Sequence, residues 1–265
     1  SKRDTSPLRK IRQTPINPMA TIVLPSVPST NTWAKEHSGT LSHGDIVVAH
    51  DQTAGRGQRG NHWEAEPGRN LTFSLFLRPG RIAPAAQFLI SEIVSLAVVK
   101  ALRRHLAETA SETVTVKWPN DIYIGDRKIA GILIEHAISG MSISHTVAGI
   151  GLNVNQTRFI SDAPNPVSMA MIAGTEFDLP AIMYEIADEI TRHTDAPDKT
   201  AIHEAYLSSL WRKDGCPHEF SMPDGTRFMA EINDVSETGM LRLNTPGGIR
   251  EFAFKEVAFI LQPQS

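Results

Sequence analysis

Charged and amide side chains crowd one kink near the middle of the chain. Residues 116–123 read VKWPNDIY, and Pro119 has no N–H to donate to a neighbouring strand. The strand must therefore break at the proline and present Lys117, Asn120 and Asp121 together at an exposed bend. Two charges of opposite sign and an amide at one bend can neutralise an anion and orient a proton transfer. A strand that simply ends in solvated polar residues would leave the same pattern.

Glycines accompany polar residues in the strands that follow this kink. Lys128 begins a strand beyond a tight turn, and Gly131 lies three residues later, where the lack of a side chain would permit a ligand to approach closely. In the segment 149–155, GIGLNVN, two glycines at a spacing of two leave one face of the strand bare, and Asn153 puts an amide on that face. A planar ring could lie there. A helix packed closely on the strand would explain the glycines equally well.

The segment 55–60, GRGQRG, has the spacing G-x-G-x-x-G that is typical of a dinucleotide-binding turn. Only six residues separate Gly60 from the pair Pro67-Gly68, and a strand follows, so no long helix can aim its dipole at a pyrophosphate. The segment is instead predicted to be a mobile loop that lets Arg56 and backbone N–H groups close over an anionic ligand.

Hydroxyl and amide groups also mark the first junction between a strand and a helix. Ser29, Thr30 and Asn31 stand where a helix is expected to begin, and such residues commonly cap helix N-termini. Hydroxyl and free N–H groups at a helix start can equally receive the polar or anionic head of a ligand.

The sequence shows no pattern of a metal centre or of a covalent hydrolase. Its histidines include neither an HExxH motif nor paired metal spacing, and it contains no G-x-S-x-G nucleophile elbow. The single cysteine, Cys216, excludes an intramolecular disulfide and, with His218, offers at most two metal ligands. We therefore expect no protein metal site and a reducing compartment.

Short apolar strands and helices alternate around these segments. Strands are expected at residues 20–27, 45–50, 70–77, 113–118, 121–124 and 128–136, with a hairpin over 137–155. Helices are expected at residues 29–37, 84–108, 166–174, 179–193 and 201–211. The first two strands should be buried, and 84–108 should be the one long helix packed on a core. The hairpins predict the α+β class, with a mixed, largely antiparallel sheet and helices packed on it.

From Lys213 the pattern changes to short alternating strands separated by DG, TG and GG turns. These strands, at residues 218–222, 227–234, 240–245 and 250–261, predict a small C-terminal SH3-like β-barrel. The expected division is a flexible basic tail at 1–19, a catalytic domain at 20–212 and the barrel at 213–265. The tail is either disordered or a trimmed organelle-targeting remnant.

Composition narrows the class of protein further. The net charge of -3 gives no overall basic field of the kind that a dedicated nucleic-acid binder tends to carry. No apolar run approaches the roughly 18 residues of a membrane span, and no hydrophobic stretch follows the basic N-terminal residues. We expect a cytoplasmic protein with no membrane partner. The alternative, based on the basic N-terminal tail, is a protein of an organelle.

Three segments in this order and spacing closely resemble the biotin protein ligases. They are DQTAGRGQRGNHW at 51–63, KWPNDIYIGDRKIAGILIE at 117–135 and GIGLNVN at 149–155. The resemblance covers about residues 20–265. It implies the catalytic domain of that family, which has a class II synthetase-like fold, followed by an SH3-like domain.

The resemblance also implies an ATP-dependent activity in two steps. Biotin and Mg-ATP would give biotinyl-5'-AMP, and a lysine of a biotin carboxyl carrier domain, in acetyl-CoA carboxylase or a related carboxylase, would then take the biotin. The Mg²⁺ would be carried by ATP. Family members that repress transcription carry a winged helix, which is not evident here, so a monofunctional enzyme without DNA binding is expected. Family members occur as a monomer or as a homodimer.

Site residues are carried over position by position. The resemblance implies catalytic roles for Arg56, Lys117, Asp121 and Lys128. It implies that biotin is bound by Ser29, Thr30, Asn31, Gln52, Gly55, Arg56, Gly57, Gln58, Lys128, Gly131 and Gly149. It implies that ATP is bound by Arg59, Asn61, Trp63, Asn120, Lys128 and Asn153.

Two residues depart from the family pattern. Gln58 and Asn61 stand where the glycine loop of the family often has further arginines, which leaves less charge to hold the adenylate. A non-catalytic biotin sensor is therefore one alternative function. The other is a lipoate or octanoate ligase of the same fold, although such an enzyme resembles these motifs poorly.

Overall fold

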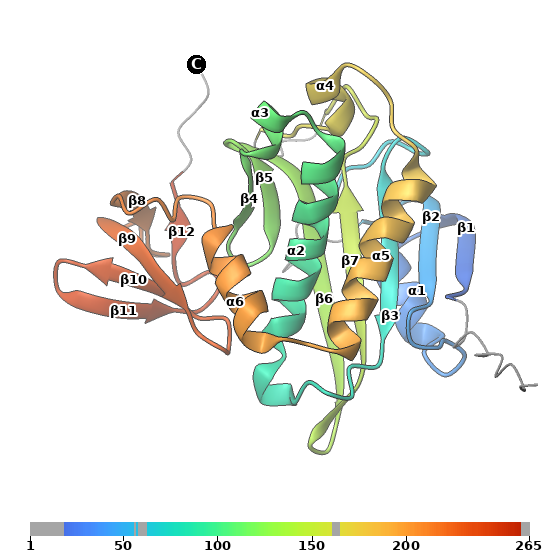
Figure 1. The fold of residues 1–265 in the computed structure, drawn as a ribbon, viewed down its shortest axis with the longest axis horizontal. Coiled ribbons are helices and arrows are strands. Elements are labelled where there is room, and N and C mark those ends of the chain that lie inside the picture. The colour runs from blue at the N-terminus through green and yellow to red at the C-terminus, as the bar shows by residue number, and fades with distance from the viewer. Residues whose placement is uncertain (1–18, 56, 58–62, 161–164, 261–265) are drawn as a thin grey trace, which may run out of the picture.

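The computed structural model describes residues 19–55, 57, 63–160 and 165–260, so the expected tail, apart from Met19, lies outside the described residues. A seven-stranded sheet carries helices on one face and stands beside a second, five-stranded sheet (Figure 1). The order of the larger sheet is β1-β2-β3-β7-β6-β5-β4, and only the β1–β2 pair is parallel. The predicted α+β class with a largely antiparallel sheet is confirmed.

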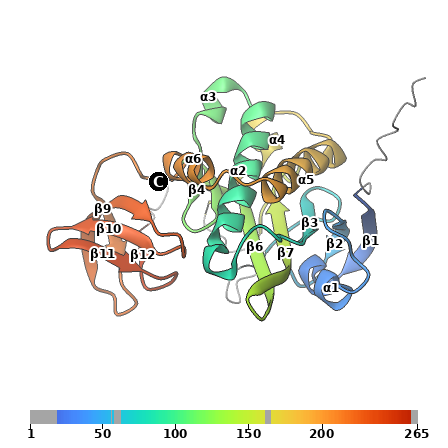
Figure 2. The same ribbon diagram turned by 60° about the horizontal axis from the view of Figure 1, so that its bottom comes forward.

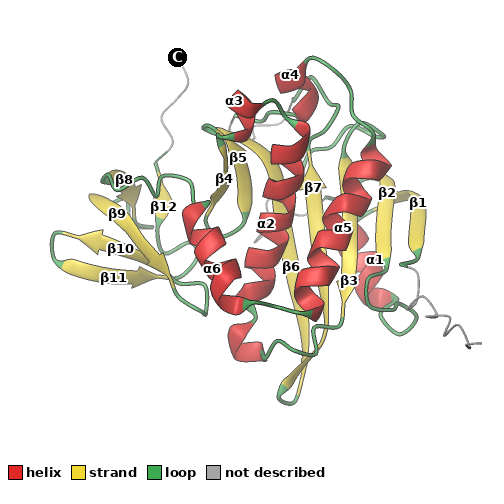
Figure 3. Cartoon of the chain, viewed as in Figure 1, coloured by secondary structure: helices red, strands yellow, loops and turns green. Residues whose placement is uncertain are grey.

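The strands of the larger sheet are β1 (Thr21–Val27), β2 (Ile46–Gln52), β3 (Leu71–Leu77), β4 (Val114–Lys117), β5 (Asp121–Ile124), β6 (Arg127–Ser139) and β7 (Ser142–Leu152). The helices are α1 (Thr30–Glu36), α2 (Phe88–His105), α3 (Glu108–Ser111), α4 (Met169–Ala173), α5 (Leu179–Asp195) and α6 (Lys199–Ser208), with a 3-10 turn η2 (Pro84–Ala86) before α2 (Figure 3).

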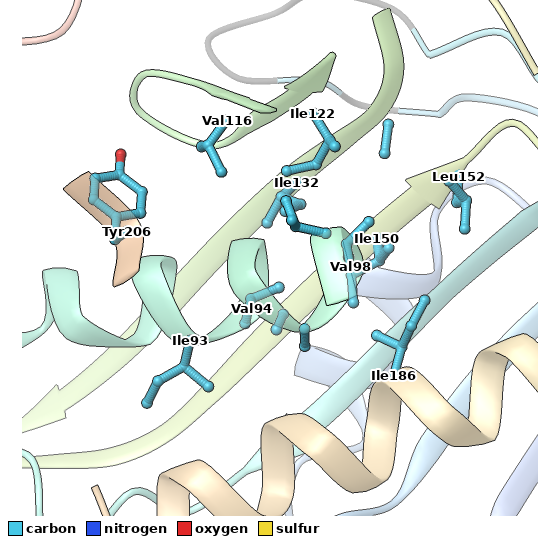
Figure 4. Close-up of a cluster of buried hydrophobic side chains, with 14 of the residues drawn as sticks. Ile93, Val94, Val98, Val116, Ile122, Ile132, Ile150, Leu152, Ile186 and Tyr206 are labelled. Carbon is cyan, nitrogen blue, oxygen red and sulfur yellow. The ribbon is translucent and has the colours of Figure 1, made fainter. Parts of the chain in front are cut away.

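The main core lies between the larger sheet and the helices α2, α5 and α6. Ile93, Val94 and Val98 of α2 meet Ile132 of β6 and Ile150 of β7 in this layer (Figure 4). Each of these side chains is 3% exposed or less. Burial of one such side chain is worth about 1.5–3 kcal/mol, so this layer fixes the sheet against α2.

The opposite face of the larger sheet carries α1. Because side chains alternate along a strand, Phe76 of β3 and Val147 of β7 point away from α2 and pack with Ala34 of α1. Ser29 caps α1 by accepting a hydrogen bond from the Thr32 N–H at 3.4 Å. The start of α1 is thereby held over the middle of the sheet, on the face without α2 and α5.

Two expectations about burial and helices were wrong. β1 is an edge strand, paired only with β2 among the described strands, and Val23 is 68% exposed; β-branched composition alone does not distinguish an edge from a centre. The helix α2 is not the one long helix on the core. α5 has 17 residues, begins at the cap Asp178, and buries Ile182, Ile186 and Ile190 at a spacing of four.

Two other expected elements are divided. The helix predicted over 84–108 ends at His105, because Leu106 adopts an extended backbone (φ -97, ψ 153) and buries its side chain instead. The strand predicted over 250–261 is likewise interrupted. Lys255 has a left-handed φ of 75°, which no continuous strand allows, so the chain turns between Phe252 and Ala258.

The second sheet is formed by β8 (His218–Ser221), β9 (Arg227–Val235), β10 (Leu241–Thr245), β11 (Gly248–Phe252) and β12 (Ala258–Phe259), in the order β11-β10-β9-β8-β12. All its pairs are antiparallel, and Figure 2 shows it standing to one side of α6.

An ionic chain joins α2 to the second sheet across α6. His203 of α6 contacts Glu92 of α2 (Nδ1 to Oε1, 2.7 Å) and Asp234 of β9 (Nε2 to Oδ1, 3.5 Å). Burial raises the pKa of the Glu92 carboxyl. Burial alone would lower the pKa of His203, but its hydrogen bond to Glu92 and the charges of Glu92 and Asp234 raise that pKa. Protonated His203 is therefore the form that fits between the two carboxylates.

This contact predicts a pH-dependent contribution of His203 to stability. Because the folded-state pKa is raised, the contribution is complete below the ordinary histidine pKa and is lost as pH rises through the folded pKa. The difference in free energy of unfolding between the native chain and His203→Gln should therefore shrink from pH 6 to pH 8 in urea titrations. His193→Gln is the matched control. A difference that stays constant or grows with pH would contradict the assignment.

Candidate active site

A cavity of about 200 Å³ opens on the face of the larger sheet that carries the start of α1. Its floor is formed by β6 and β7, where Gly131, Gly149 and Gly151 alternate with residues that face the main core. β2 and the start of α1 close one end. The turn between β4 and β5, together with Phe254 of the smaller sheet's region, closes the other end.

One end of the cavity is a connected set of polar side chains. The Gln52 Oε1 atom accepts from the Thr30 backbone N–H at 2.9 Å and lies 3.3 Å from the Thr30 hydroxyl. The Ser74 hydroxyl lies 2.8 Å from the Thr30 hydroxyl and donates to Asn31 Oδ1 at 2.6 Å. Thr30, Asn31 and Ser74 are each less than 5% exposed. A buried set of this kind is stable only with defined donors and acceptors.

The direction of these hydrogen bonds follows from the chemistry of the atoms. Asn31 Oδ1 can only accept a hydrogen bond, so the single hydroxyl proton of Ser74 is donated to Asn31. The hydroxyl proton of Thr30 is then donated to Ser74 or to Gln52 Oε1. Among the described residues, the Gln52 amide N–H groups and the Ser29 proton then have no acceptor. This end of the cavity thus presents donors from Gln52 and Ser29 and acceptors from Thr30 and Asn31.

The glycines of the floor make room for side chains of the protein itself. A Cβ atom on Gly149 would lie 2.2 Å from Asn31 Oδ1, and one on Gly151 would lie 2.4 Å from the Trp63 indole. A Cβ on Gly131 would lie 3.0 Å from the same ring. At Gly151 and Gly131 the bare face is covered by the planar ring of Trp63, whereas at Gly149 it admits Asn31 of α1, so close packing of a helix explains that glycine.

Lys128 and Asp121 form an ion pair at the other end, with Nζ and Oδ2 2.8 Å apart. The Lys128 Nζ atom lies 5.8 Å from the centre of the Trp63 ring, which places the cation beside the floor of the cavity. A cation, a carboxylate and an aromatic ring therefore converge where a substrate entering the cavity would meet them.

The bend after β4 is not exposed, which corrects the expectation for Lys117, Asn120 and Asp121. Asn120 is 3% exposed, and Lys117 is half-buried with its Nζ atom 5.7 Å from the centre of the Phe259 ring. Burial lowers the pKa of Lys117, and the charge of Asp121 partly offsets this by raising it. The cause is a long-range contact that no local pattern contains, since the C-terminal region packs over the bend.

Trp118 is the residue that carries this contact. Its peptide bond to Pro119 is cis, and its indole N–H donates to the Gly239 carbonyl at 3.0 Å. The Trp118 ring also meets Phe254 edge to face, with ring centres 5.9 Å apart. The C-terminal region, through Gly239 and Phe254, thus holds the bend in place.

The cavity brings together most of the residues expected to form the site. Those lining it are Ser29, Thr30, Asn31, Gln52, Gly57, Trp63, Lys117, Asn120, Asp121, Lys128, Gly131 and Gly149. The expected residues Arg56, Gln58, Arg59 and Asn61 lie outside the described residues.

Gly55 and Asn153 are described but do not line the cavity. The Gly55 carbonyl accepts from the Trp63 N–H at 3.0 Å, and a Cβ atom there would lie 2.9 Å from the Gln52 Nε2 atom, so Gly55 makes room for its neighbours. Asn153 is buried and donates from Nδ2 to the Val167 carbonyl at 3.1 Å. The strand alternation that placed Asn153 on the glycine face does not continue past Leu152, where β7 ends.

Several lining residues were not predicted. They are Thr72, Phe73, Trp118, Pro119, Ile132, Leu133, Ile150, Gly151 and Phe254, with Ser74 directly behind the cavity. Gly151 was recognisable as the second glycine of the GIG pair. Phe254 carries no local signal, because it reaches the cavity only through the packing of the two sheets.

The described residues contain no group of three or more His, Cys, Asp or Glu side chains placed to hold a metal ion. Among the same residues, no helix is long and apolar enough to cross a membrane.

Comparisons with known proteins show the family of the chain. The profile of the Biotin/lipoate A/B protein ligase family matches residues 23–153. The chain is 33% identical over 237 residues to the bifunctional ligase/repressor BirA of Bacillus subtilis, which covers 84% of this chain and 69% of that protein. It is 42% identical over 113 residues to the BirA of Escherichia coli, which covers 43% of this chain and only 34% of that protein.

The fold is also similar to a solved structure of a biotin protein ligase from Aquifex aeolicus in complex with biotin and ATP. The TM-score is 0.73 at 25% sequence identity, and the match covers 92% of this chain and 99% of the other.

The contact between Gly149 and Asn31 predicts a strong effect of a small substitution. Gly149→Ala would drive a methyl group into a buried amide held on both sides, so we expect the free energy of unfolding to fall by about 1–3 kcal/mol. Gly39→Ala is the matched control, because a Cβ atom there meets nothing within 4 Å. Chemical denaturation of both variants measures the effect, and equal stabilities would show that Asn31 is not fixed where the structure has it.

Proposed function

This chain belongs to the biotin/lipoate A/B protein ligase family, and we propose that it is an ATP-dependent biotin protein ligase. In the first step, a carboxylate oxygen of biotin bonds to the α-phosphorus of ATP, and pyrophosphate leaves. In the second step, a lysine Nζ bonds to the acyl carbon of biotinyl-5'-AMP, AMP leaves with the electron pair, and the nitrogen loses a proton. The lysine belongs to a carrier domain of a biotin-dependent carboxylase.

The polar end of the cavity is the observation that carries the choice of biotin. The ureido ring of biotin has one carbonyl oxygen and two N–H groups. The carbonyl matches the donors of Gln52 and Ser29, and the two N–H groups match the acceptors of Thr30 and Asn31. Each buried hydrogen bond left unmade would cost about 1–3 kcal/mol, so the match favours a cyclic urea over an apolar ring.

A lipoate or octanoate substrate fits this end of the cavity poorly. The dithiolane ring of lipoate has no N–H group and no carbonyl, and the chain of octanoate has neither. Either acid would leave the Gln52 amide N–H groups and the Ser29 proton without an acceptor, and would bring no donor to the remaining lone pairs of Thr30 and Asn31.

The first step needs positive charge near the joined carboxylate and phosphate. Lys128 supplies it from within the cavity, with Lys117 as a second cation at the same bend. Arg56, in the glycine loop, is proposed to close over the acyl phosphate. The Mg²⁺ would enter with the phosphates of ATP, which supply its oxygen ligands together with water.

The second step needs the incoming lysine to be oriented and deprotonated. Asp121 is the one carboxylate that lines the cavity within the described residues, and its ion pair with Lys128 holds it 2.8 Å from a cation. We assign Asp121 the orientation of the lysine ammonium, since an aspartate is a weak base for a full proton transfer.

The C-terminal region completes the site rather than standing apart from it. Phe254 lines the cavity, and the Gly239 carbonyl holds Trp118 at the bend. We keep residues 20–212 and 213–265 as the proposed division into a catalytic domain and a C-terminal domain, because the two sheets share no strand.

A direct assay tests the proposed function. The purified chain is incubated with biotin, Mg-ATP and a carrier domain of acetyl-CoA carboxylase, and the carrier is then probed with avidin. We expect an avidin-reactive carrier that depends on all three components. Biotin binding without any labelled carrier would instead support the non-catalytic sensor.

Asp121→Asn should separate the two steps. We expect biotin transfer to the carrier to slow by about a hundredfold, because a neutral amide orients an ammonium poorly, while adenylate formation changes less. Pyrophosphate exchange measures the first step, and single-turnover transfer from preformed adenylate measures the second. Asp126→Asn is the matched control, since Asp126 accepts from the Trp211 indole outside the cavity. Equal slowing of both steps would contradict the role of Asp121.

A further inference from the structure

Glu135 of β6 does not line the cavity, yet it contacts the residue that closes the cavity's polar end. Its Oε2 atom accepts from Asn31 Nδ2 at 3.0 Å, and its Oε1 atom accepts from Lys35 Nζ at 2.6 Å. Glu135 is thus anchored from the solvent side by the cation of Lys35 and faces the buried amide of Asn31 on the other side. Asn31, which Glu135 contacts directly, lines the cavity.

The Glu135 carboxylate and the Leu133 carbonyl together decide which way the Asn31 amide points. Both Nδ2 protons are used, one by the Leu133 carbonyl at 3.1 Å and one by the Glu135 carboxylate at 3.0 Å. A carboxylate can only accept, so the nitrogen must face Glu135 and the oxygen must face Ser74. A flipped amide would set Oδ1 against two acceptors and lose both hydrogen bonds.

The orientation of Asn31 in turn sets the direction of the hydrogen bonds beyond it. Ser74, which is fully buried and does not line the cavity, donates to Asn31 Oδ1 and therefore cannot donate to Thr30. The Ser74 hydroxyl oxygen can still accept a hydrogen bond from the Thr30 hydroxyl. The Glu135 carboxylate, which contacts Asn31 directly, thus helps to determine that Asn31 Oδ1 faces Ser74 and that Ser74 does not donate to Thr30.

We propose that Glu135 is a positioning residue for ligand specificity: together with the Leu133 carbonyl, it fixes through Asn31 and Ser74 the hydrogen-bond polarity that recognises the two N–H groups of a cyclic urea. The proposal rests on the proposed biotin ligase function. A flipped Asn31 would turn an N–H donor toward a ring N–H of the ligand, and two donors cannot pair. The geometry of the cavity would be unchanged, but its chemical complementarity would be lost.

The test uses Glu135→Gln, which keeps the size of the side chain but adds a donor that tolerates either orientation of Asn31. We expect the KM for biotin in pyrophosphate exchange to rise about fivefold, as for loss of one hydrogen bond, with kcat and the KM for ATP unchanged. Glu176→Gln is the control of identical chemistry, because Glu176 is paired with Arg69 at the surface, and should leave all three constants unchanged.

A double-mutant cycle separates positioning from general destabilisation. Ser74→Ala removes the donor to Asn31, so its effect on the biotin KM should be non-additive with that of Glu135→Gln, because both act through one amide. Glu135→Gln and Glu176→Gln should combine additively. Thermal melts report folding separately, and Ser74→Ala tests the same chain of contacts if Glu135→Gln folds poorly.

The outcomes distinguish this proposal from the proposed function. An unchanged biotin KM in folded Glu135→Gln, additive effects in the cycle, or an equal rise in the KM for ATP would overturn the positioning role while the native chain remains an active ligase. Absence of biotin-dependent pyrophosphate exchange in the native chain would instead refute the proposed function.

Discussion

The site depends on a stretch of sheet surface that carries no side chains. Gly149, Gly151 and Gly131 leave bare backbone on β6 and β7, so that Asn31 from one side and Trp63 from the other can lie directly on the sheet. A Cβ atom at Gly149 or Gly151 would lie too close to these side chains for them to keep their positions. Two parts of the cavity depend on this constraint: the place of Asn31 at the polar end and the place of Trp63 on the floor.

The two ends of the cavity are built on different principles. At the polar end, local order comes from the start of α1, whose cap residue and first turn carry groups that line the cavity. At the charged end, order comes from contacts distant in sequence. Tyr206 of α6 donates to the Pro119 carbonyl at 2.6 Å, and the Gly239 carbonyl accepts from Trp118. The polar end of the cavity is therefore formed by a helix start, and the charged end by a bend supported from the C-terminal region.

The sequence predicted the parts of the site that local chemistry determines. The proline fixed the break after Lys117, the glycine pair fixed the bare face, and the polar run at Ser29 fixed the helix start. It failed where the outcome depends on what packs from elsewhere. The bend was expected to be exposed but is covered, and Phe254 was not anticipated at all. The edge position of β1 was missed for the same reason, since strand composition does not state which neighbours a strand has.

The central claim is that the polar end of the cavity recognises a cyclic urea, and calorimetric titration of the native chain with biotin and with lipoate tests it most directly. Both acids carry a carboxylate on an aliphatic chain, so their difference in affinity isolates the ring. The account predicts that biotin binds at least about a hundredfold more tightly than lipoate, because a site built for hydrogen bonds rejects a ligand that cannot make them. Equal affinities, or tighter binding of lipoate, would contradict it.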